Sequence, residues 1–189
     1  LKAFELALKR GFAFELDVML SKDQEVLVFH DEELSRMTGV LGEFIQWNAA
    51  DLKVLKLLKS DQTPPSLSQV WQLIYGQVPI HLEIKQEGVV GPLESKVLDL
   101  LKTYAGPICI LSFNPNTLQW FKVHGPEYIR VLNIEGPFGF DHRLLSLIYD
   151  VLKSRPHMIN SDVQSLSPLS VMLLRPLIPL GAYTIHDSL

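Results

Sequence analysis

Two carboxylates stand two residues apart in the segment Phe14–Val18, at Glu15 and Asp17. If this segment is a strand, both side chains point to the same side, because successive side chains of a strand alternate between its faces. Two like charges held side by side repel each other, and a hard divalent cation between them removes that repulsion. Taken alone, the spacing fits a solvated strand face better than a cation site. The apolar residues around the two acids, from Phe12 to Val18, instead predict a strand that is buried on both faces.

Three polar side chains alternate along a second apolar run, residues 79–85, at His81, Glu83 and Lys85. On a strand they share one face, and Glu83 can join the first two carboxylates as a third oxygen ligand. Three carboxylates without clustered His or Cys favour Mg²⁺ or Ca²⁺ over zinc. An ordinary ion pair between Glu83 and Lys85 explains this run equally well when it is taken alone. We expect His81 to lie one layer deeper in the fold and to have a structural role.

A histidine, His30, ends the apolar run Val26–Phe29 and is followed by Asp31. A lone histidine at a strand end more often holds a structural hydrogen bond than it takes part in catalysis. Near a metal held by carboxylates, however, it can act as a general acid or base, because the pKa of imidazole lies near neutral pH. Lys85 would supply the local positive charge that an anionic oxygen such as phosphate requires.

The elements that must position these groups alternate regularly along the chain. Strands are predicted near 12–18, 26–31, 79–85, 108–113, 128–134, 157–163 and 178–185, and helices near 1–10, 49–59, 67–76, 90–104, 115–124, 141–154 and 167–175. Such repeated units predict an α/β fold with a parallel sheet and helices outside it. We favour a (β/α)8 TIM barrel that lacks its first strand and its last helix, as a single domain over residues 1–189. An open doubly wound sheet competes with it, but no G-x-G-x-x-G follows a strand.

Two local details of this arrangement remain open in the sequence. The helix near 67–76 begins at Ser66 or at Ser68. If the first two strands are parallel, residues 18–25 must run back in an extended conformation, because the link is too short for a crossover helix.

The composition limits the classes of function. With 189 residues, 47% of them hydrophobic and 20% charged, the chain is typical of a soluble globular protein with a sizeable core. A net charge of −4 without a Lys/Arg run predicts no attraction to nucleic acid. The single Cys109 excludes an intrachain disulfide framework and lies in an apolar run, so we expect it to pack in the core. No uninterrupted apolar stretch of about eighteen residues occurs, so no membrane span is expected.

Taken together, these segments resemble the glycerophosphodiester phosphodiesterase family, in that family's order. The resemblance rests on E-L-D-V at Glu15–Val18, F-H-D-x-x-L-x-R-x-T-G at Phe29–Gly39, E-I-K at Glu83–Lys85, Leu111-Ser112-Phe113 and Tyr183-Thr184-Ile185. It implies a barrel enzyme that hydrolyses a small-molecule glycerophosphodiester to glycerol 3-phosphate and an alcohol. Such an enzyme uses a divalent cation, Mg²⁺ or Ca²⁺, and two histidines.

The resemblance also implies a role for each matching residue. Glu15, Asp17 and Glu83 would be metal ligands, His30 one of the acid/base pair, and Lys85 a contact to the substrate phosphate or to a neighbouring ligand. Further candidates for lining the pocket are Ser112, Phe113, Phe138 and Tyr183. The loop that carries Phe138 is equally consistent with a plain surface turn. A lysophospholipase D-type activity and a catalytically impaired barrel that binds a phosphorylated ligand or a partner are the alternative functions.

One part of the family pattern has no counterpart in these residues. The family opens on an H-R-G strand that carries the other catalytic histidine and an arginine, and this segment would precede Leu1. We expect either that it stands upstream in a longer product or that the chain is impaired in hydrolysis. The start within a helical pattern and the odd number of predicted strands favour the first expectation.

Overall fold

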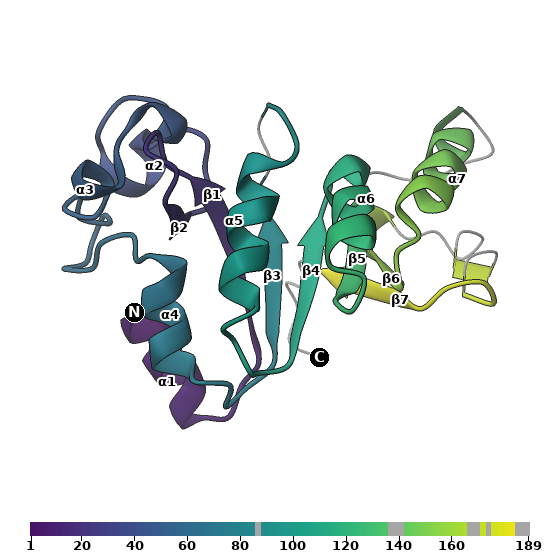
Figure 1. Ribbon diagram of the computed structural model, residues 1–189, viewed down its shortest axis with the longest axis horizontal. Coiled ribbons are helices and arrows are strands. Elements are labelled where there is room, and N and C mark those ends of the chain that lie inside the picture. Colours follow the sequence, from purple (N-terminus) through teal and green to yellow (C-terminus); the bar gives the residue numbers. More distant parts are fainter. Residues whose placement is uncertain (86–87, 136–141, 166–170, 173–174, 184–189) are drawn as a thin grey trace. The chain divides into compact units, whose positions relative to one another are not determined.

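The computed structural model describes residues 1–85, 88–135, 142–165, 171–172 and 175–183. These residues form two compact units, 1–108 and 109–189, which are described one after the other (Figure 1). The first unit contains α1 (Lys2–Lys9), β1 (Phe14–Leu20), β2 (Val26–Val28), α2 (Ser35–Thr38), the 3₁₀ helix η1 (Phe44–Gln46), α3 (Ala49–Leu52), α4 (Leu67–Ile74), β3 (Ile80–Ile84) and α5 (Pro92–Leu101). The strand β4 (Ile108–Ser112) leads into the second unit, which continues with α6 (Pro115–His124), β5 (Ile129–Ile134), α7 (His142–Ser154), β6 (Met158–Asp162), the 3₁₀ helix η2 (Val163–Ser165) and β7 (Leu180–Tyr183).

The sheet of the first unit has β1 between β2 and β3. The strands β1 and β3 are parallel, and their register places Glu15 opposite His81 and Asp17 opposite Glu83. Residues paired across a parallel ladder lie on the same face, so this register brings the acidic side chains together.

The strand β2 pairs with β1 in the antiparallel direction, with Val18 opposite Val28. The extended return of residues 18–25, expected for two parallel strands, is therefore absent here. A tight turn reverses the chain instead, and in it the Ser21 N–H donates to the Glu25 carbonyl (3.0 Å). Antiparallel strands need only such a short link, which removes the irregularity that the sequence presented.

A small apolar core lies under this hairpin and supports the segment that follows it. Its members are Met19, Leu27, Phe29, Leu34, Phe44, Ala49 and Leu52, all of them buried. The rings of Phe29 and Phe44 stack with their centroids 5.1 Å apart. The core therefore fixes the chain on both sides of His30.

The predicted helix near 49–59 is wrong over most of its length, because α3 ends at Leu52. The Leu57 N–H donates to the Gln62 carbonyl (2.8 Å) and the Leu58 N–H to the Met37 carbonyl (2.7 Å), so these donors are not available to a helix. The apolar residues of this stretch gave a helical pattern, but a local turn and a long-range hydrogen bond to Met37 determine its conformation instead.

The first of the two serines that the sequence offered, Ser66, caps helix α4. The Gln69 N–H donates to the Ser66 hydroxyl (3.2 Å), and the Ser66 N–H donates to the Gln69 side-chain carbonyl (2.9 Å), which together make a capping box. Figure 1 shows α4 beside α1, and the two helices are in contact.

In the second unit, β4, β5, β6 and β7 lie side by side in that order, and all of their pairs are parallel. Helix α6 has the bounds that the sequence predicted, with Pro115 at its first position and the Asn114 side chain accepting the Asn116 N–H (2.9 Å). The strands and α7 occur near their predicted positions. The predicted helix near 167–175 falls largely outside the described residues.

The described part of the chain therefore contains seven strands, as predicted, and β1–β2 is the antiparallel pair among those described. The single-domain organisation over residues 1–189 stays a prediction. Cys109 is half-buried, and burial raises the pKa of its thiol to about 11. None of the described helices has the length and hydropathy needed to cross a membrane.

We predict that Ser66→Ala lowers the free energy of unfolding by about 1 kcal/mol, because it removes the oxygen that accepts the Gln69 N–H. Urea denaturation monitored by circular dichroism measures this change. The matched control is Ser68→Ala, which alters an exposed serine in the first turn of the same helix. We expect it to change stability by less than about 0.5 kcal/mol. Equal losses in the two variants would contradict the assignment of Ser66 as the cap.

Candidate functional site

Three carboxylates converge at the parallel pair of β1 and β3. Glu15, Asp17 and Glu83 each offer one oxygen, and these oxygens all lie within 4.8 Å of one another. The convergence follows from the register, which places Asp17 opposite Glu83 on one face, with Glu15 two residues earlier on the same side. Three carboxylate oxygens at this spacing fit a hard divalent cation, whose preferred ligands are oxygen atoms.

The two faces of β1 differ in burial. Leu16 and Val18 are 3% and 0% exposed, whereas Glu15 is exposed and Asp17 is half-buried. The prediction that this strand is buried on both faces is therefore wrong at Glu15. The polar face carries the cluster, and the apolar face belongs to the core.

Lys85 is the cation that pairs with this cluster. Its ammonium group lies 3.3 Å from Asp17 Oδ1 and also forms an ion pair with Glu83 Oε1. The Lys85 N–H donates to the Val18 carbonyl (3.1 Å), which continues the strand ladder and fixes the start of the side chain. Burial by itself lowers the pKa of Lys85, but pairing with Glu83 and Asp17 outweighs this effect and raises it, so the side chain stays charged.

Glu15 has a strongly raised pKa in this cluster. Loss of solvation around its carboxyl group, followed by repulsion from Asp17 and Glu83, raises the pKa of Glu15 to about 7. Part of this side chain faces solvent, yet the carboxyl end lies among protein atoms and neighbouring carboxylates. A carboxyl group with this pKa is half protonated near neutral pH, and a bound cation favours its ionised form.

His30 lies one residue beyond a backbone hydrogen bond to the acidic strand. The Phe29 N–H donates to the Asp17 carbonyl (3.1 Å), so the antiparallel pairing extends to the residue before His30. The His30 Nδ1 lies 2.6 Å from Asp31 Oδ1. The structure thus gives this histidine a carboxylate partner of its own, distinct from the three that form the cluster.

Arg36 is a member of this group that the sequence analysis did not single out. Its guanidinium donates to both oxygens of Asp31, through Nε to Oδ2 (2.5 Å) and through Nη2 to Oδ1 (2.6 Å). The signal was present in the sequence, since Arg36 belongs to the F-H-D-x-x-L-x-R-x-T-G motif. A short helix, α2, brings it back toward Asp31.

The pocket candidates of the second unit have different surroundings from one another. Ser112 is buried, and its hydroxyl accepts the Asn114 N–H (3.1 Å) at the turn into α6. Phe113 and Tyr183 meet edge to face with ring centroids 6.0 Å apart, and the Tyr183 hydroxyl donates to the Ile134 carbonyl (2.7 Å). Phe138 lies outside the described residues. The lining roles of all four stay predictions.

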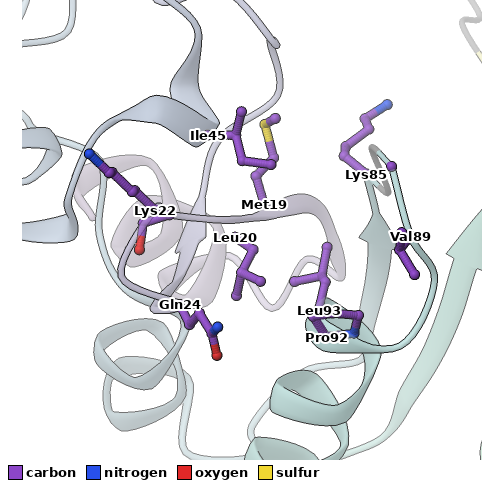
Figure 2. Close-up of a pocket in the computed structure, with 11 residues that line it drawn as sticks. Met19, Leu20, Lys22, Gln24, Ile45, Lys85, Val89, Pro92 and Leu93 are labelled. Atoms are coloured by element: carbon purple, nitrogen blue, oxygen red, sulfur yellow. The ribbon is translucent and has the colours of Figure 1, made fainter.

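The structure also contains a pocket that sequence reasoning did not find. It has a volume of about 360 Å³ and lies at the ends of β1 and β3 and the start of α5 (Figure 2). Apolar walls come from Met19, Leu20, Ile45, Val89 and Leu93, and the polar side chains include Lys22, Gln24 and Lys85. Figure 2 shows Leu20 and Leu93 facing each other, with Lys85 at the end of β3. Because Lys85 lines this pocket and also pairs with Asp17 and Glu83, the pocket adjoins the carboxylate cluster.

His81 occupies the position in register with Glu15, two residues before Glu83 on β3. In the part of the chain that the structure describes, the His81 side chain is exposed. The structural role expected for it from the sequence stays a prediction.

Comparison with known proteins identifies what this arrangement is similar to. The model of the glycerophosphoryl diester phosphodiesterase family matches residues 1–162. A glycerophosphodiester phosphodiesterase from Caldanaerobacter subterraneus subsp. tengcongensis is 31% identical over 136 residues, which are 66% of this chain and 56% of that protein. A lysophospholipase D from Homo sapiens is 33% identical over 120 residues, which are 54% of this chain and 36% of that protein. The chain therefore matches little more than half of the first relative and about a third of the second.

Solved structures confirm the α/β fold of the TIM-barrel type that the sequence predicted. A phosphodiesterase from Oleispira antarctica, in complex with the product sn-glycerol-3-phosphate, has a TM-score of 0.84 and 26% identity, covering 98% of this chain and 78% of that one. A glycerophosphodiester phosphodiesterase from Thermotoga maritima has a TM-score of 0.77 and 25% identity, covering 98% of this chain and 79% of that one.

We predict that, without divalent ions, the free energy of unfolding falls as the pH rises between the usual glutamate value of 4.5 and about 7. The folded protein retains a proton on Glu15 in this window, whereas the unfolded chain has released it, so a rising pH favours the unfolded chain. After discounting for solvent screening, we expect a loss of about 1 kcal/mol. Urea denaturation at several pH values measures it, and adding Mg²⁺ or Ca²⁺ at the upper end should reverse it.

The variant Glu15→Gln should remove this pH dependence, because it carries no titrating group at that position. The matched control is Asp61→Asn, which removes a carboxylate whose side chain is 87% exposed, and we expect it to retain the wild-type slope. A slope in Glu15→Gln equal to that of the wild type would contradict the assignment.

Proposed function

This chain belongs to the glycerophosphoryl diester phosphodiesterase family, and on that premise we propose that it is a metal-dependent hydrolase of glycerophosphodiesters. The products would be glycerol 3-phosphate and an alcohol. The observation that carries this proposal is the convergence of three carboxylate oxygens within 4.8 Å, paired with a lysine, in the unit that also holds His30. The complex of the Oleispira antarctica phosphodiesterase with sn-glycerol-3-phosphate supports the choice of substrate class.

In this proposal Glu15, Asp17 and Glu83 hold a divalent cation, Mg²⁺ or Ca²⁺. Both ions prefer carboxylate oxygens, and the described cluster contains neither a cysteine nor a histidine that would favour zinc. When bound, such an ion supplies Lewis-acid polarisation of the phosphoryl oxygens. Titration of the protein with each ion by calorimetry distinguishes the two.

The remaining chemistry falls to side chains of the chain itself. His30 would move a proton at the attacking or the leaving oxygen through the ring nitrogen that does not face Asp31. Lys85 stays charged beside Asp17 and Glu83, and its ammonium would contact a phosphate oxygen of the substrate or hold the two carboxylates in place.

A lysophospholipase D-type activity is a second candidate, and the pocket of Figure 2 favours it. The pocket adjoins Lys85 and has walls formed largely by aliphatic side chains, including Leu20, Val89 and Leu93. Its volume of about 360 Å³ lies in the range of small-molecule sites, and aliphatic walls lower the free energy of a bound hydrocarbon chain. An acylated glycerophosphodiester could place its chain there while its phosphate lies near Lys85.

We predict that Glu15→Ala, Asp17→Asn and Glu83→Gln each reduce kcat/KM for glycerophosphocholine by about 100-fold or more, because each removes a charge from the cation site. Choline release measures turnover, and a chelator should abolish it. Asp61→Asn, which removes an exposed carboxylate elsewhere in the first unit, serves as the control and should retain the wild-type rate.

The same assays separate the proposal from its alternatives. Hydrolysis that proceeds equally in a chelator would contradict metal dependence. Metal-dependent binding of glycerol 3-phosphate without turnover would favour the catalytically impaired barrel that binds a phosphorylated ligand.

For the second candidate, we predict that Val89→Asp raises KM for lysophosphatidylcholine about tenfold and leaves KM for glycerophosphocholine unchanged within about twofold. The new carboxylate would lie in the aliphatic wall of the pocket. A hydrocarbon chain bound there would displace water from the carboxylate and could form no hydrogen bond with it. Val89 is 79% exposed, so the variant should fold normally. The control is Val54→Asp, at a valine that is 73% exposed and does not line the pocket. Equal changes for both substrates would argue against an acyl site here.

A further inference from the structure

A chain of three side chains extends from His30 to Asp31 and on to Arg36. The His30 Nδ1 lies 2.6 Å from Asp31 Oδ1, and Arg36 holds the same carboxylate through Nη2 to Oδ1 (2.6 Å) and Nε to Oδ2 (2.5 Å). The exposed fractions of the side chains are 58% for His30, 15% for Asp31 and 65% for Arg36. The carboxylate in the middle is therefore the shielded member, and the imidazole reaches solvent.

The backbone between these residues is fixed at several points. The Leu34 side chain is fully buried, and its N–H donates to the Gly42 carbonyl (2.9 Å). The Thr38 hydroxyl donates to the Leu34 carbonyl (2.8 Å), and Gly39 ends the short helix with φ +76, a left-handed conformation that glycine adopts without strain. The backbone position of Arg36 relative to Asp31 is thus set by the fold.

The carboxylate of Asp31 is suited to accept a hydrogen bond from a ring nitrogen that carries a proton. The paired hydrogen bonds from Arg36 hold the pKa of Asp31 below its usual range, so the group remains an ionised acceptor. A neutral imidazole carries one N–H, and an acceptor beside Nδ1 favours the tautomer with the proton on Nδ1. The lone pair of Nε2 is then directed away from Asp31.

We propose that Asp31 and Arg36 are positioning residues that fix the ring orientation and the Nδ1–H tautomer of His30, leaving Nε2 as the nitrogen that exchanges protons with substrate. The inference rests on the proposed function for the assignment of His30 as an acid/base group. Arg36 acts through Asp31. The two hydrogen bonds from its guanidinium orient the carboxylate so that Oδ1 faces the imidazole.

The test observes the imidazole directly. In protein labelled with ¹⁵N-histidine, two-bond ¹H–¹⁵N correlation spectra report which ring nitrogen carries the proton, at a pH where the spectrum shows the ring to be neutral. The chain has six histidines, and His30→Gln assigns the signal of interest by its loss. We expect an Nδ1–H tautomer in the wild type and a mixture, or a majority of Nε2–H, in Asp31→Asn and in Arg36→Gln.

Kinetics of the same variants give the second readout. We expect kcat for glycerophosphocholine to fall about 10- to 100-fold with KM changed by less than about threefold. Arg36→Lys keeps the positive charge but loses the paired hydrogen bonds of the guanidinium, so its kcat should lie between that of the wild type and that of Arg36→Gln. Glu25→Gln, which breaks another surface ion pair of the first unit, with Lys53, is the control and should leave the His30 spectrum unchanged.

Each outcome has a definite meaning. A wild-type Nε2–H tautomer, or an unchanged tautomer in both Asp31→Asn and Arg36→Gln, would overturn the inference. If Asp31→Asn fails to fold, Arg36→Gln decides the question alone, because Arg36 is an exposed side chain. If the tautomer shifts as expected but no variant or wild-type protein hydrolyses the diester, the positioning role stands and the proposed function fails.

Discussion

The repulsion among three carboxylates on neighbouring strands is the constraint on which the site depends. Parallel pairing of β1 and β3 places Asp17 directly opposite Glu83, and the alternation of side chains adds Glu15 to the same face. The apolar residues of the opposite face, such as Leu16 and Val18, pack in the core and fix this register. Burial of the apolar face therefore offsets the electrostatic cost of the acidic one, and Lys85 reduces that cost further.

The hairpin connects this cluster to the histidine. Because β2 returns antiparallel to β1, the ladder ends with the Phe29 N–H on the Asp17 carbonyl, and His30 follows at once. The stacked rings of Phe29 and Phe44 anchor the chain just before it leaves the sheet. His30 thus lies on a rigid support, which the proposed role in proton transfer requires.

Residue alternation placed Glu15 and Asp17 on one strand face and Glu83 with Lys85 on another, and the family resemblance joined the three carboxylates into one cluster. The direction of β2 was less accessible, since a sequence shows the length of the link between strands but not the hydrogen bonds that reverse it. The helix expected beyond Leu52 is absent for a related reason. The Leu57 N–H donates forward to the Gln62 carbonyl, and the Leu58 N–H donates to the carbonyl of Met37, which is distant in the sequence. Likewise, the pairing of Arg36 with Asp31 depends on a turn of helix α2 whose position only tertiary structure defines.

The charge of the cluster bears on the proposed binding of an anionic diester by an acidic chain. Three ionised carboxylates and the ammonium of Lys85 leave two net negative charges, which would repel a phosphodiester. Loss of solvation, followed by repulsion from Asp17 and Glu83, raises the pKa of Glu15 to about 7, so protonation of Glu15 can relieve part of this excess. The cluster thus matches the charge of one divalent cation, and with that charge balanced the repulsion disappears. The net charge of −4 over the whole chain would then be no obstacle to the proposed substrate, since a cation in the cluster would leave the surroundings of Lys85 locally neutral.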